Sequence, residues 1–412
     1  MNGKFSKNPY KLKIIIHFMI VKSIFAKQVK DSRNKGTIRV ILKTSLGKFV
    51  SSAPAGKSTG KYEVKSYAKS LDGDIEFINN IDIEKINKLD LKEFEDLEKI
   101  EKKVKRKIGG NSLFVLEACI LKAMAKENGK ELWQFLLKSH VLFEDNRGLR
   151  IRPVGNTIGG GLHSKGVRKM KPDFQEFLFI ASGKTFKERV KINRTAYKLA
   201  KRLVKAKRRN DEGAWETGSS NEEVLEVMRR VRDRLKEKRM KVDIGLDIAA
   251  SGFYKNREYV YKNPERNLSK PDQIADIKSL IKHYRIPYVE DPMDENDFPG
   301  FRSLNETKAM IVGDDLTTTD PDRLKKAIRT KAISGIIVKP NQIGSLLKVR
   351  EVVELAKKYK IKTIISHRSG ETMDNTIADL GVGFGCDFIK TGIYGRVRSV
   401  KLKRLIKIEK QL

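Results

Sequence analysis

The chain has 412 residues, of which 39 % are hydrophobic and 34 % are charged. This length exceeds one small domain and supports a core, so we expect one large domain and a smaller one. The 87 Lys and Arg residues outnumber the 52 Asp and Glu residues, which gives a formal net charge of +35. Such a field attracts anions, whether nucleic acid, membrane surfaces or phosphorylated metabolites, and a solvated basic coat explains it more simply.

The cysteine content and the start of the chain indicate a cytoplasmic protein. Cys119 and Cys386 are too few for a disulfide framework, which fits a reducing compartment. The apolar run at residues 14–20 is too short to span a bilayer, and no small-residue cleavage site follows it. We therefore expect no membrane partner. Residues 1–18 have no recognisable pattern and are expected to be an extension, disordered or upstream of the true start.

The first third of the chain predicts an α+β domain. Three runs, VKSIFAKQ, TIRVILKT and GKFVSSAP, alternate between apolar and polar residues from residue 21 onward, which favours a small antiparallel sheet. Asn111 and Ser112 are expected to open a helix whose apolar residues recur at helical spacing until Gly129 ends it. We assign residues 19–145 to an N-terminal α+β capping domain.

The second half has a different rhythm, in which short β-rich runs alternate with helical segments about every 25 residues. The repeat predicts an α/β fold with a C-terminal (β/α)8-type barrel over residues 146–412, in preference to an open sheet. Reactive groups of such barrels lie at the C-terminal ends of strands. The runs end at Asp247, Glu290, Asp314, Lys339, His367 and Lys390.

The strand ends carry the candidate chemistry. Asp247, Glu290 and Asp314 end three successive strands and offer oxygen ligands to a hard cation. One such carboxylate is more often a cap or a salt bridge, whereas three at equivalent positions favour a metal. Lys339 and Lys390 would face the same mouth, where they can bind phosphate or carboxylate. Either one, with a pKa lowered by nearby cations, can instead act as a base.

Two further acidic residues stand in suggestive surroundings. Glu176 lies in the apolar run FQEFLFI, and Glu212 lies in NDEG after a basic helical segment. Paired carboxylates near a metal are candidates for acid catalysis. Alone, each signal is weak, because a Glu in a strand is usually just exposed.

Several blocks in one order and spacing resemble the enolase family, in a divergent, archaeal-like form, over residues 21–412. The blocks are GKSTGKYE (56–63), the GGGLH stretch ending at His163, QEF, DEG, LDIAAS (246–251), EDP (290–292), VGDDLT (312–317), KPNQIGS (339–345), SHRSGET (366–372) and IKTG (389–392). One short block would mean little, but the ordered set is a specific signal.

This resemblance implies a ββαα(βα)6 barrel with an N-terminal cap. It also implies a lyase that reversibly dehydrates 2-phosphoglycerate to phosphoenolpyruvate in glycolysis and gluconeogenesis, with two Mg²⁺ ions per active site. The expected partners are the small phosphorylated carboxylate substrate and at least one further copy of the chain, as a homodimer or a larger homo-oligomer. Nucleic acid is an optional partner that the basic charge allows.

The resemblance also implies roles for individual residues. The first Mg²⁺ is assigned to Asp247, Glu290 and Asp314, and the second to a site that includes Ser58. Lys339 is the expected base at C2, and Glu212, helped by Glu176, is the expected acid. The substrate is assigned to His163, His367, Arg368, Ser369 and Lys390, with Glu176, Glu290 and Asp314 also facing it. We expect burial beside Trp215 to raise the pKa of Glu212.

The sequence departs from the family pattern at several positions. Lys57 replaces a small residue in PAGKST, Leu162 replaces a polar residue in GGGLH, and Trp215 follows the acid in NDEGAW. Gly252 replaces a common Glu, and the arginine-rich segment near the C-terminus reads RVRS at residues 396–399. These changes bear on loop closure, turnover and the dimer interface, since each metal ligand and the base are retained.

Three alternatives remain open at this level. GKST at residues 56–59 resembles a phosphate-binding loop of nucleotide hydrolases, although Ser51 stands where that motif needs a glycine. A paralogue with lost or altered activity that binds nucleic acid would explain the basic charge. Another member of the same superfamily would act on a different carboxylate.

Overall fold

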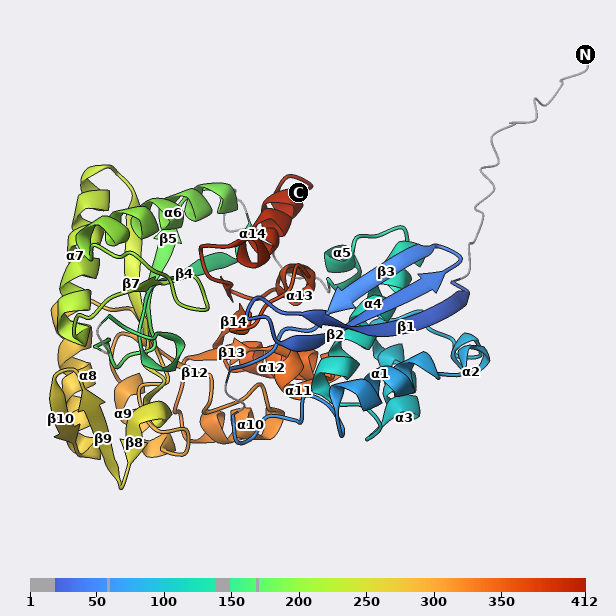
Figure 1. Ribbon diagram of the computed structural model, residues 1–412, viewed down its shortest axis with the longest axis horizontal. Coiled ribbons are helices and arrows are strands. Elements are labelled where there is room, and N and C mark those ends of the chain that lie inside the picture. Colours follow the sequence, from blue (N-terminus) through green and yellow to red (C-terminus); the bar gives the residue numbers. More distant parts are fainter. Residues whose placement is uncertain (1–18, 58–59, 138–148, 168–169) are drawn as a thin grey trace, which may run out of the picture.

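The computed structural model describes residues 19–57, 60–137, 149–167 and 170–412 (Figure 1). A small sheet with its helices lies at one side of the molecule, and the barrel occupies the other side. The predicted boundary between residues 145 and 146 and the predicted extension of residues 1–18 fall outside the described residues. No helix in the described part of the chain is long and apolar enough to cross a membrane.

The N-terminal part forms the predicted antiparallel sheet, packed on helices. Its strands are β1 (Val21–Lys30), β2 (Gly36–Thr44) and β3 (Gly47–Ser52), in the order β1-β2-β3. Its helices are α1 (Leu71–Asn79), α2 (Ile83–Asn87), α3 (Leu97–Val104), α4 (Gly110–Glu127) and α5 (Leu132–Leu136). Alternate β2 residues Ile38, Val40 and Leu42 are fully buried, and α4 packs against β2 and β3. Side chains of a strand point alternately to its two faces, so the alternation of apolar and polar residues predicted these strands correctly.

The start of α4 differs from the prediction. Gly109 is the N-cap residue, so Asn111 and Ser112 lie inside the first turn instead of capping it. Both side chains are buried. The Asn111 Oδ1 accepts a hydrogen bond of 2.8 Å from the Asn341 Nδ2 of the barrel. Asn111 therefore joins the two parts of the molecule. The preference of such residues for the first position of a helix does not predict this role.

The C-terminal part is a closed barrel of eight strands. They are β4 (Arg152–Gly159), β5 (Glu176–Ser182), β7 (Lys241–Asp247), β11 (Tyr288–Glu290), β12 (Met310–Gly313), β13 (Gly335–Val338), β14 (Lys362–Ser366) and β15 (Phe388–Lys390). Pairing of β15 with β4 closes the sheet. Strand β5 runs antiparallel to both neighbours, and the other barrel pairs are parallel. This confirms the ββαα(βα)6 arrangement.

Helices cover the outside of the barrel. They are α6 (Phe186–Leu203), α7 (Asn221–Glu237), α8 (Lys270–Tyr284), α9 (Phe298–Asn305), α10 (Pro321–Arg329), the short α11 (Pro340–Ile343), α12 (Leu346–Lys358), α13 (Thr376–Gly383) and α14 (Arg396–Glu409). Side-chain caps fix several of their starts, as in the reciprocal hydrogen bonds between Ser220 and Glu223 at α7. Inside the barrel, Tyr288, Val312 and Ile337 pack from successive strands.

Two small additions complete the barrel domain. An antiparallel sheet of β8 (Tyr254–Lys255), β9 (Glu258–Lys262) and β10 (Glu265–Leu268) follows β7, and β6 (Trp215–Glu216) pairs with β4. Within the barrel, Glu290 is level with Asp247 on one neighbouring strand and with Val312 on the other. The strand-end residues of β7, β11 and β12 therefore meet at one mouth.

The N-terminal part docks on this mouth. Ala55 and Gly370 exchange two backbone hydrogen bonds of 2.7 and 2.9 Å. The Asp374 carboxylate accepts hydrogen bonds from the Ser51 hydroxyl at 2.9 Å and the Ser52 N–H at 3.1 Å. Burial alone would raise the pKa of Asp374, but Lys122 and hydrogen bonds from Thr376 hold it below the ordinary aspartate value.

We predict that Asp374→Asn destabilises the fold at pH 7 by about 1–3 kcal/mol, because a charged acceptor at the contact is lost. The folded-state pKa of Asp374 is lowered, so its stabilisation is present above the unfolded pKa of about 3.9 and is lost as pH falls further. Urea unfolding at pH 7 and pH 3 measures this difference. A matched exposed change, Asp90→Asn, should have little effect, and equal losses for both variants would contradict the prediction.

Candidate active site

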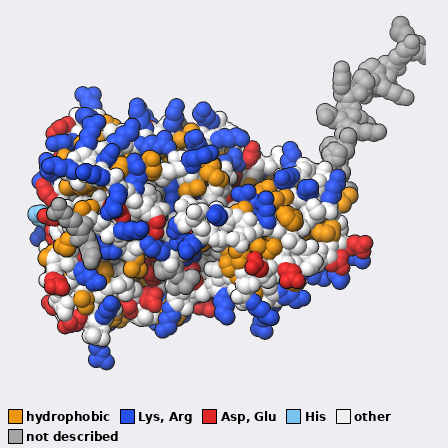
Figure 2. Space-filling model, viewed as in Figure 1, with side chains coloured by type: hydrophobic (Ala, Val, Ile, Leu, Met, Phe, Trp, Pro, Cys, Tyr) orange, Lys and Arg blue, Asp and Glu red, His pale blue; other side chains and the backbone are white. Residues whose placement is uncertain are grey.

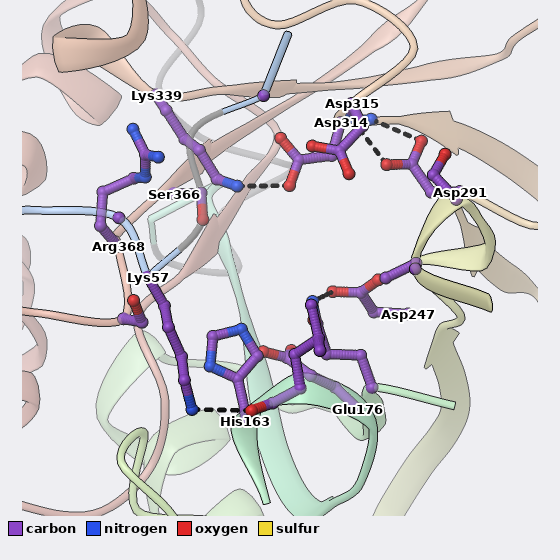
Figure 3. Close-up of a pocket in the computed structure, with 18 of the residues that line it drawn as sticks. Lys57, His163, Glu176, Asp247, Asp291, Asp314, Asp315, Lys339, Ser366 and Arg368 are labelled. Atoms are coloured by element: carbon purple, nitrogen blue, oxygen red, sulfur yellow. Dashed lines mark hydrogen bonds and ion pairs between the residues drawn. The ribbon is translucent and has the colours of Figure 1, made fainter. Parts of the chain in front are cut away.

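A pocket of about 290 Å³ opens at the barrel mouth, with walls from both parts of the molecule. Nearly all of the predicted site residues line it (Figure 3). They are His163, Glu176, Glu212, Asp247, Asp314, Lys339, His367, Arg368, Ser369 and Lys390. Glu290 is fully buried beneath the pocket surface, and Ser58 lies outside the described residues.

Lys390, at the end of β15, is the centre of the acidic side of the pocket. Its Nζ lies 2.8 Å from the Asp247 Oδ2, 2.8 Å from the Glu290 Oε1 and 3.1 Å from the Glu176 Oε2. All four side chains are buried. Burial and the Asp247 charge raise the pKa of Glu290 to about 8, although Lys390 opposes this. One ammonium thus stands among three carboxylates, which leaves an excess of acidic groups.

Lys339, directly after β13, forms an ion pair with Asp314, directly after β12. Figure 3 shows its ammonium group pointing at that carboxylate. Burial alone would lower the pKa of Lys339, but the adjacent Asp314 charge raises it above the ordinary lysine value. The nearest charge to the Lys339 ammonium is this carboxylate, and the expectation that bound cations lower the Lys339 pKa stays a prediction.

Asp291 and Asp315 are acids of the mouth that sequence reasoning missed. Oxygens of Asp291, Asp314 and Asp315 lie within 4.8 Å of one another, which is close enough to hold a cation. However, the Asp291 carboxylate already accepts the N–H groups of Asp314 at 2.9 Å and Asp315 at 2.6 Å. It therefore holds the turn that presents Asp314. Both residues stand in motifs that the sequence analysis already singled out, Asp291 as the second acid of EDP and Asp315 as the second acid of VGDDLT.

The donor set at the mouth fits a hard divalent cation. The Asp314 Oδ1 is buried and has no hydrogen-bond partner among the described residues, an arrangement that costs free energy unless something binds it. Asp247 and Glu290 stand level on neighbouring strands, and Asp314 follows the next strand. Carboxylate oxygens are the ligands that Mg²⁺ prefers. Asp247, Glu290 and Asp314 could thus hold one ion.

The wall next to this acidic side carries Glu212 on a tight loop. The Asn210 Oδ1 accepts the N–H groups of Glu212 at 3.1 Å and Ala214 at 2.9 Å. The Glu212 Oε2 accepts a hydrogen bond of 3.1 Å from the Asn156 Nδ2. His163 Nδ1 lies 3.1 Å from Asp211 and 3.8 Å from Glu212. A histidine and two carboxylates therefore form one wall.

Glu212 and Glu176 share a hydrogen bond, and their pKa values are pushed apart. Burial raises the pKa of Glu176 well above the ordinary value. His163 and the hydrogen bond from Glu176 hold the pKa of Glu212 well below it, although burial opposes this. The predicted rise for Glu212 is therefore wrong, and Glu176 is the member of the pair whose pKa is raised. Trp215 stacks on Tyr197 at 4.8 Å between ring centroids.

The segment after β14 places a histidine, an arginine and a serine at the third side of the pocket. Arg398 lies behind it, contacts the His367 Nδ1, and donates to the carbonyls of Arg368 and Ser369 at 2.6 Å each. Burial and the Arg398 charge lower the pKa of His367 well below its usual range. His367 is therefore neutral. Within the RVRS segment at residues 396–399, Arg398 is thus the residue that holds this side of the pocket.

The N-terminal part also contributes to this side of the pocket. The Arg368 guanidinium donates to the Glu63 carboxylate at 2.9 and 3.0 Å. Arg33 Nη1 donates to the Ser369 hydroxyl at 3.0 Å. Sequence reasoning quoted GKYE as part of a matching block without giving Glu63 a role. Glu63 and Arg33 now join the two parts of the molecule through the segment at residues 366–372.

Lys57 makes a further link across the pocket. Its Nζ donates to the Leu162 carbonyl at 2.7 Å and lies 3.1 Å from the Asp211 Oδ2. Asp211 also lies against His163. Lys57 thus adds a positive charge beside the wall that holds His163 and Glu212, and ties residues 55–57 to that wall.

Fold and pocket together define an enzyme built as a capped barrel. Carboxylate, lysine, histidine and arginine side chains meet at the mouth of this barrel. Two family models match the chain: "Enolase, C-terminal TIM barrel domain" over residues 150–412 and "Enolase, N-terminal domain" over residues 21–136. The chain belongs to the enolase family, whose members are lyases.

Curated relatives extend over nearly the whole chain. It is 35 % identical to the enolase of Thermoplasma acidophilum over 411 residues, covering 95 % of this chain and 98 % of that protein. It is 34 % identical to the enolase of Picrophilus torridus, with 95 % and 99 % coverage. It is 35 % identical to the enolase of Methanocorpusculum labreanum, with 94 % and 98 % coverage.

We predict that Lys57→Ala lowers kcat/KM about two- to fivefold, because a partly exposed ion pair to Asp211 is lost. The effect should shrink at high salt, and Lys57→Arg should restore most of the activity. Lys61→Ala is the matched control, since Lys61 lines the same pocket without an ion pair among the described residues. Equal effects of both alanine variants on steady-state kinetics would show that Lys57 contributes only general positive charge.

Proposed function

We propose that this protein catalyses the reversible dehydration of 2-phosphoglycerate to phosphoenolpyruvate, in the cytoplasm, as a step of glycolysis and gluconeogenesis. The observation that carries the proposal is the arrangement of Lys339 and the Glu176–Glu212 pair. Figure 3 places Lys339 and Glu176 on opposite sides of one pocket, and Glu212 shares a hydrogen bond with Glu176. A base and an acid on opposite sides suit removal of a proton from one carbon and hydroxide from the next.

The pocket matches a small dianionic or trianionic substrate. Its volume of about 290 Å³ suits a three-carbon acid phosphate. Arg368, Ser369 and the neutral His367 offer hydrogen-bond donors on one side, and His163 stands on the opposite wall. Arg–phosphate and Arg–carboxylate contacts are charge-assisted and directional. We assign these residues, with Lys390, to the phosphate and the carboxylate.

We propose that Asp247, Glu290 and Asp314 hold one Mg²⁺ and that Ser58 contributes to a second. The support is the excess of carboxyl groups over ammonium groups, together with the Asp314 Oδ1, which has no hydrogen-bond partner in the described part of the chain. When bound, the ions would stabilise the negative charge that develops on the substrate carboxylate. Lys390, whose ammonium group contacts both Asp247 and Glu290, lines the same pocket.

The reaction divides between two sets of side chains. A cation held by Asp314 would weaken the pairing of this carboxylate with Lys339 and lower the lysine pKa. In its deprotonated form, Lys339 accepts the C2 proton on its Nζ, and the electron pair of the C–H bond moves toward the carboxylate. The C3–O bond then breaks, and the departing hydroxide takes a proton from the Glu212–Glu176 pair and leaves as water. Asn156 and Asn210 hold Glu212 for this step through its carboxylate and its N–H group. In the reverse direction the same pair accepts the proton of the attacking water.

The proposed metal ligands predict that turnover depends on Mg²⁺. EDTA should abolish turnover and Mg²⁺ should restore it. Asp314→Asn should weaken Mg²⁺ binding, measured by calorimetry, at least tenfold, because one anionic ligand becomes neutral. Exposed Asp322→Asn is the control and should bind Mg²⁺ as wild type does. Full turnover after exhaustive chelation would refute this metal assignment.

The division of labour predicts separable isotope exchange. With 2-phosphoglycerate in heavy water, Lys339→Ala should lose both deuterium uptake at C2 and product. Glu212→Gln should lose most product yet keep measurable uptake, since proton removal is intact. NMR at C2 and absorbance of phosphoenolpyruvate follow the two events. Wild-type exchange by Lys339→Ala would place the base elsewhere.

A further inference from the structure

One wall of the pocket holds a connected set of three side chains, Lys57, Asp211 and His163. The Asp211 Oδ2 lies 3.1 Å from the Lys57 Nζ, and the Asp211 Oδ1 lies 3.1 Å from the His163 Nδ1. The two oxygens of one carboxylate thus contact a lysine on one side and a histidine on the other. The proposed reaction uses His163 for the substrate but gives Asp211 no role.

Three segments that are far apart in the chain bring these side chains together. Asp211 stands on the tight loop between α6 and β6. His163 ends the short helical turn Gly161–His163, which follows β4. Lys57 reaches this wall from the N-terminal part (Figure 3), where it also donates to the Leu162 carbonyl at 2.7 Å. The contact therefore exists only in the assembled pocket.

The contacts of the His163 ring fix the place of its hydrogen. Nδ1 lies 3.1 Å from Asp211 and 3.8 Å from Glu212, so this nitrogen faces two carboxyl groups. A nitrogen in that position donates, since a carboxylate oxygen only accepts. The Nδ1 hydrogen is therefore present in both the neutral and the charged ring, and the second proton binds at Nε2. The imidazole lines the pocket, where Nε2 is the nitrogen that can meet a substrate anion.

The charges around His163 oppose one another. Burial alone would lower the pKa of His163, but the charges of Glu212 and Asp211 raise it above the ordinary histidine value, and the Lys57 charge works against them. Asp211 and Lys57 thus act on His163 in opposite directions. The further charged or titratable groups of this region are Lys171, held by the Ser164 carbonyl at 2.9 Å, and Glu176, His367 and Arg398, which act on Glu212.

Lys57 differs from the many basic residues of the outer surface. Figure 2 shows Lys and Arg side chains spread over one face of the molecule, whereas the Lys57 ammonium group is held at two points of the pocket wall. The enolase pattern has a small residue at this position, and a small side chain could not reach Asp211. The Lys57 side chain is 43 % exposed and that of Asp211 is 19 % exposed. Solvent and salt therefore screen the lysine charge more strongly than the carboxylate charge.

We propose that Asp211 is a positioning residue that holds the Nδ1 hydrogen of His163 and directs Nε2 to a phosphate or carboxylate oxygen of the substrate, and that Lys57 moderates this hold. The substrate part rests on the proposed function. When Nε2 is protonated, the imidazolium donates a charge-assisted hydrogen bond to the anion. Asp211 also keeps the Nδ1 hydrogen from Glu212, whose carboxylate stays bonded to Asn156 and available to the substrate hydroxyl group.

The first test uses the protein with Mg²⁺ and without substrate. Histidine labelled with ¹³C and ¹⁵N gives ring signals for the five histidines, and the signal missing from His163→Gln identifies His163. The ¹⁵N shifts should show a neutral ring with its hydrogen on Nδ1. A neutral ring with its hydrogen on Nε2 would overturn the proposal.

Titration of the same signal separates the two neighbours of His163 by sign. Asp211→Asn should lower the His163 midpoint by about 1 pH unit, because a close opposite charge is lost. Lys57→Met should raise the midpoint by about 0.2–0.7 pH unit, the range of a partly exposed charge pair. The rise in Lys57→Met should shrink in high salt.

Two controls remove a charge that does not contact this wall. Lys61→Met, in the same pocket, and the exposed Asp322→Asn should leave the His163 midpoint unchanged. A wild-type midpoint in either Asp211→Asn or Lys57→Met, or shifts of both in one direction, would overturn the proposal. If Asp211→Asn does not fold, Lys57→Met still decides, because its side chain is partly exposed and its loss leaves the core intact.

Steady-state kinetics with 2-phosphoglycerate test the link to the substrate. The KM should rise above the His163 midpoint, because deprotonated Nε2 no longer donates. The pH at which this rise begins should be lower in Asp211→Asn and higher in Lys57→Met than in wild type. A KM profile that is the same in all three proteins would overturn the role of Nε2 in substrate binding. Absence of turnover in the wild-type protein would instead refute the proposed function, and the histidine titrations would still decide whether Asp211 positions His163.

Discussion

The site depends on one buried ammonium group placed among carboxylates. Lys390 contacts Asp247, Glu290 and Glu176 at 2.8 to 3.1 Å, and all four side chains are buried at the barrel mouth. Removing several carboxylates from water costs far more than folding could tolerate unless counter-charges are present. One lysine meets only part of that need. The carboxyl groups in excess of that lysine have raised pKa values, as at Glu290, and a divalent cation would bind them in their ionised form.

The N-terminal part of the molecule completes the pocket, because barrel strands alone leave the mouth open. Glu63 holds Arg368 through two hydrogen bonds, Arg33 holds Ser369, and Lys57 reaches the Asp211 wall. Each link joins residues that are more than 100 positions apart. The groups assigned to phosphate and carboxylate are thereby fixed before substrate arrives, and orientation fixed in advance lowers the entropic cost of binding.

The many Lys and Arg residues of the chain fall into two structural sets. Cations such as Arg398 and Lys401 are buried and bind the backbone and side chains around the pocket. Others, such as Lys198 and Arg396, surround an outer groove without acidic partners among the described residues. Composition alone cannot separate these sets, because both contribute equally to the net charge. Helical periodicity on α6 and α14 separates them, since one face of each helix packs on the barrel.

The sequence by itself determined the barrel, its cap and most of the mouth. Period-two alternation specified β1 to β3, and the repeat of strands ending in Asp247, Glu290, Lys339 and Lys390 specified a parallel barrel, because strand ends converge wherever such strands close. Tertiary structure alone decided which charges meet. It set Asp314 against Lys339, raised the pKa of Glu176 instead of that of Glu212, and brought Glu63 and Arg398 to the pocket. A pKa depends on distances of a few ångströms between residues far apart in the chain, and no local pattern in a sequence encodes those distances.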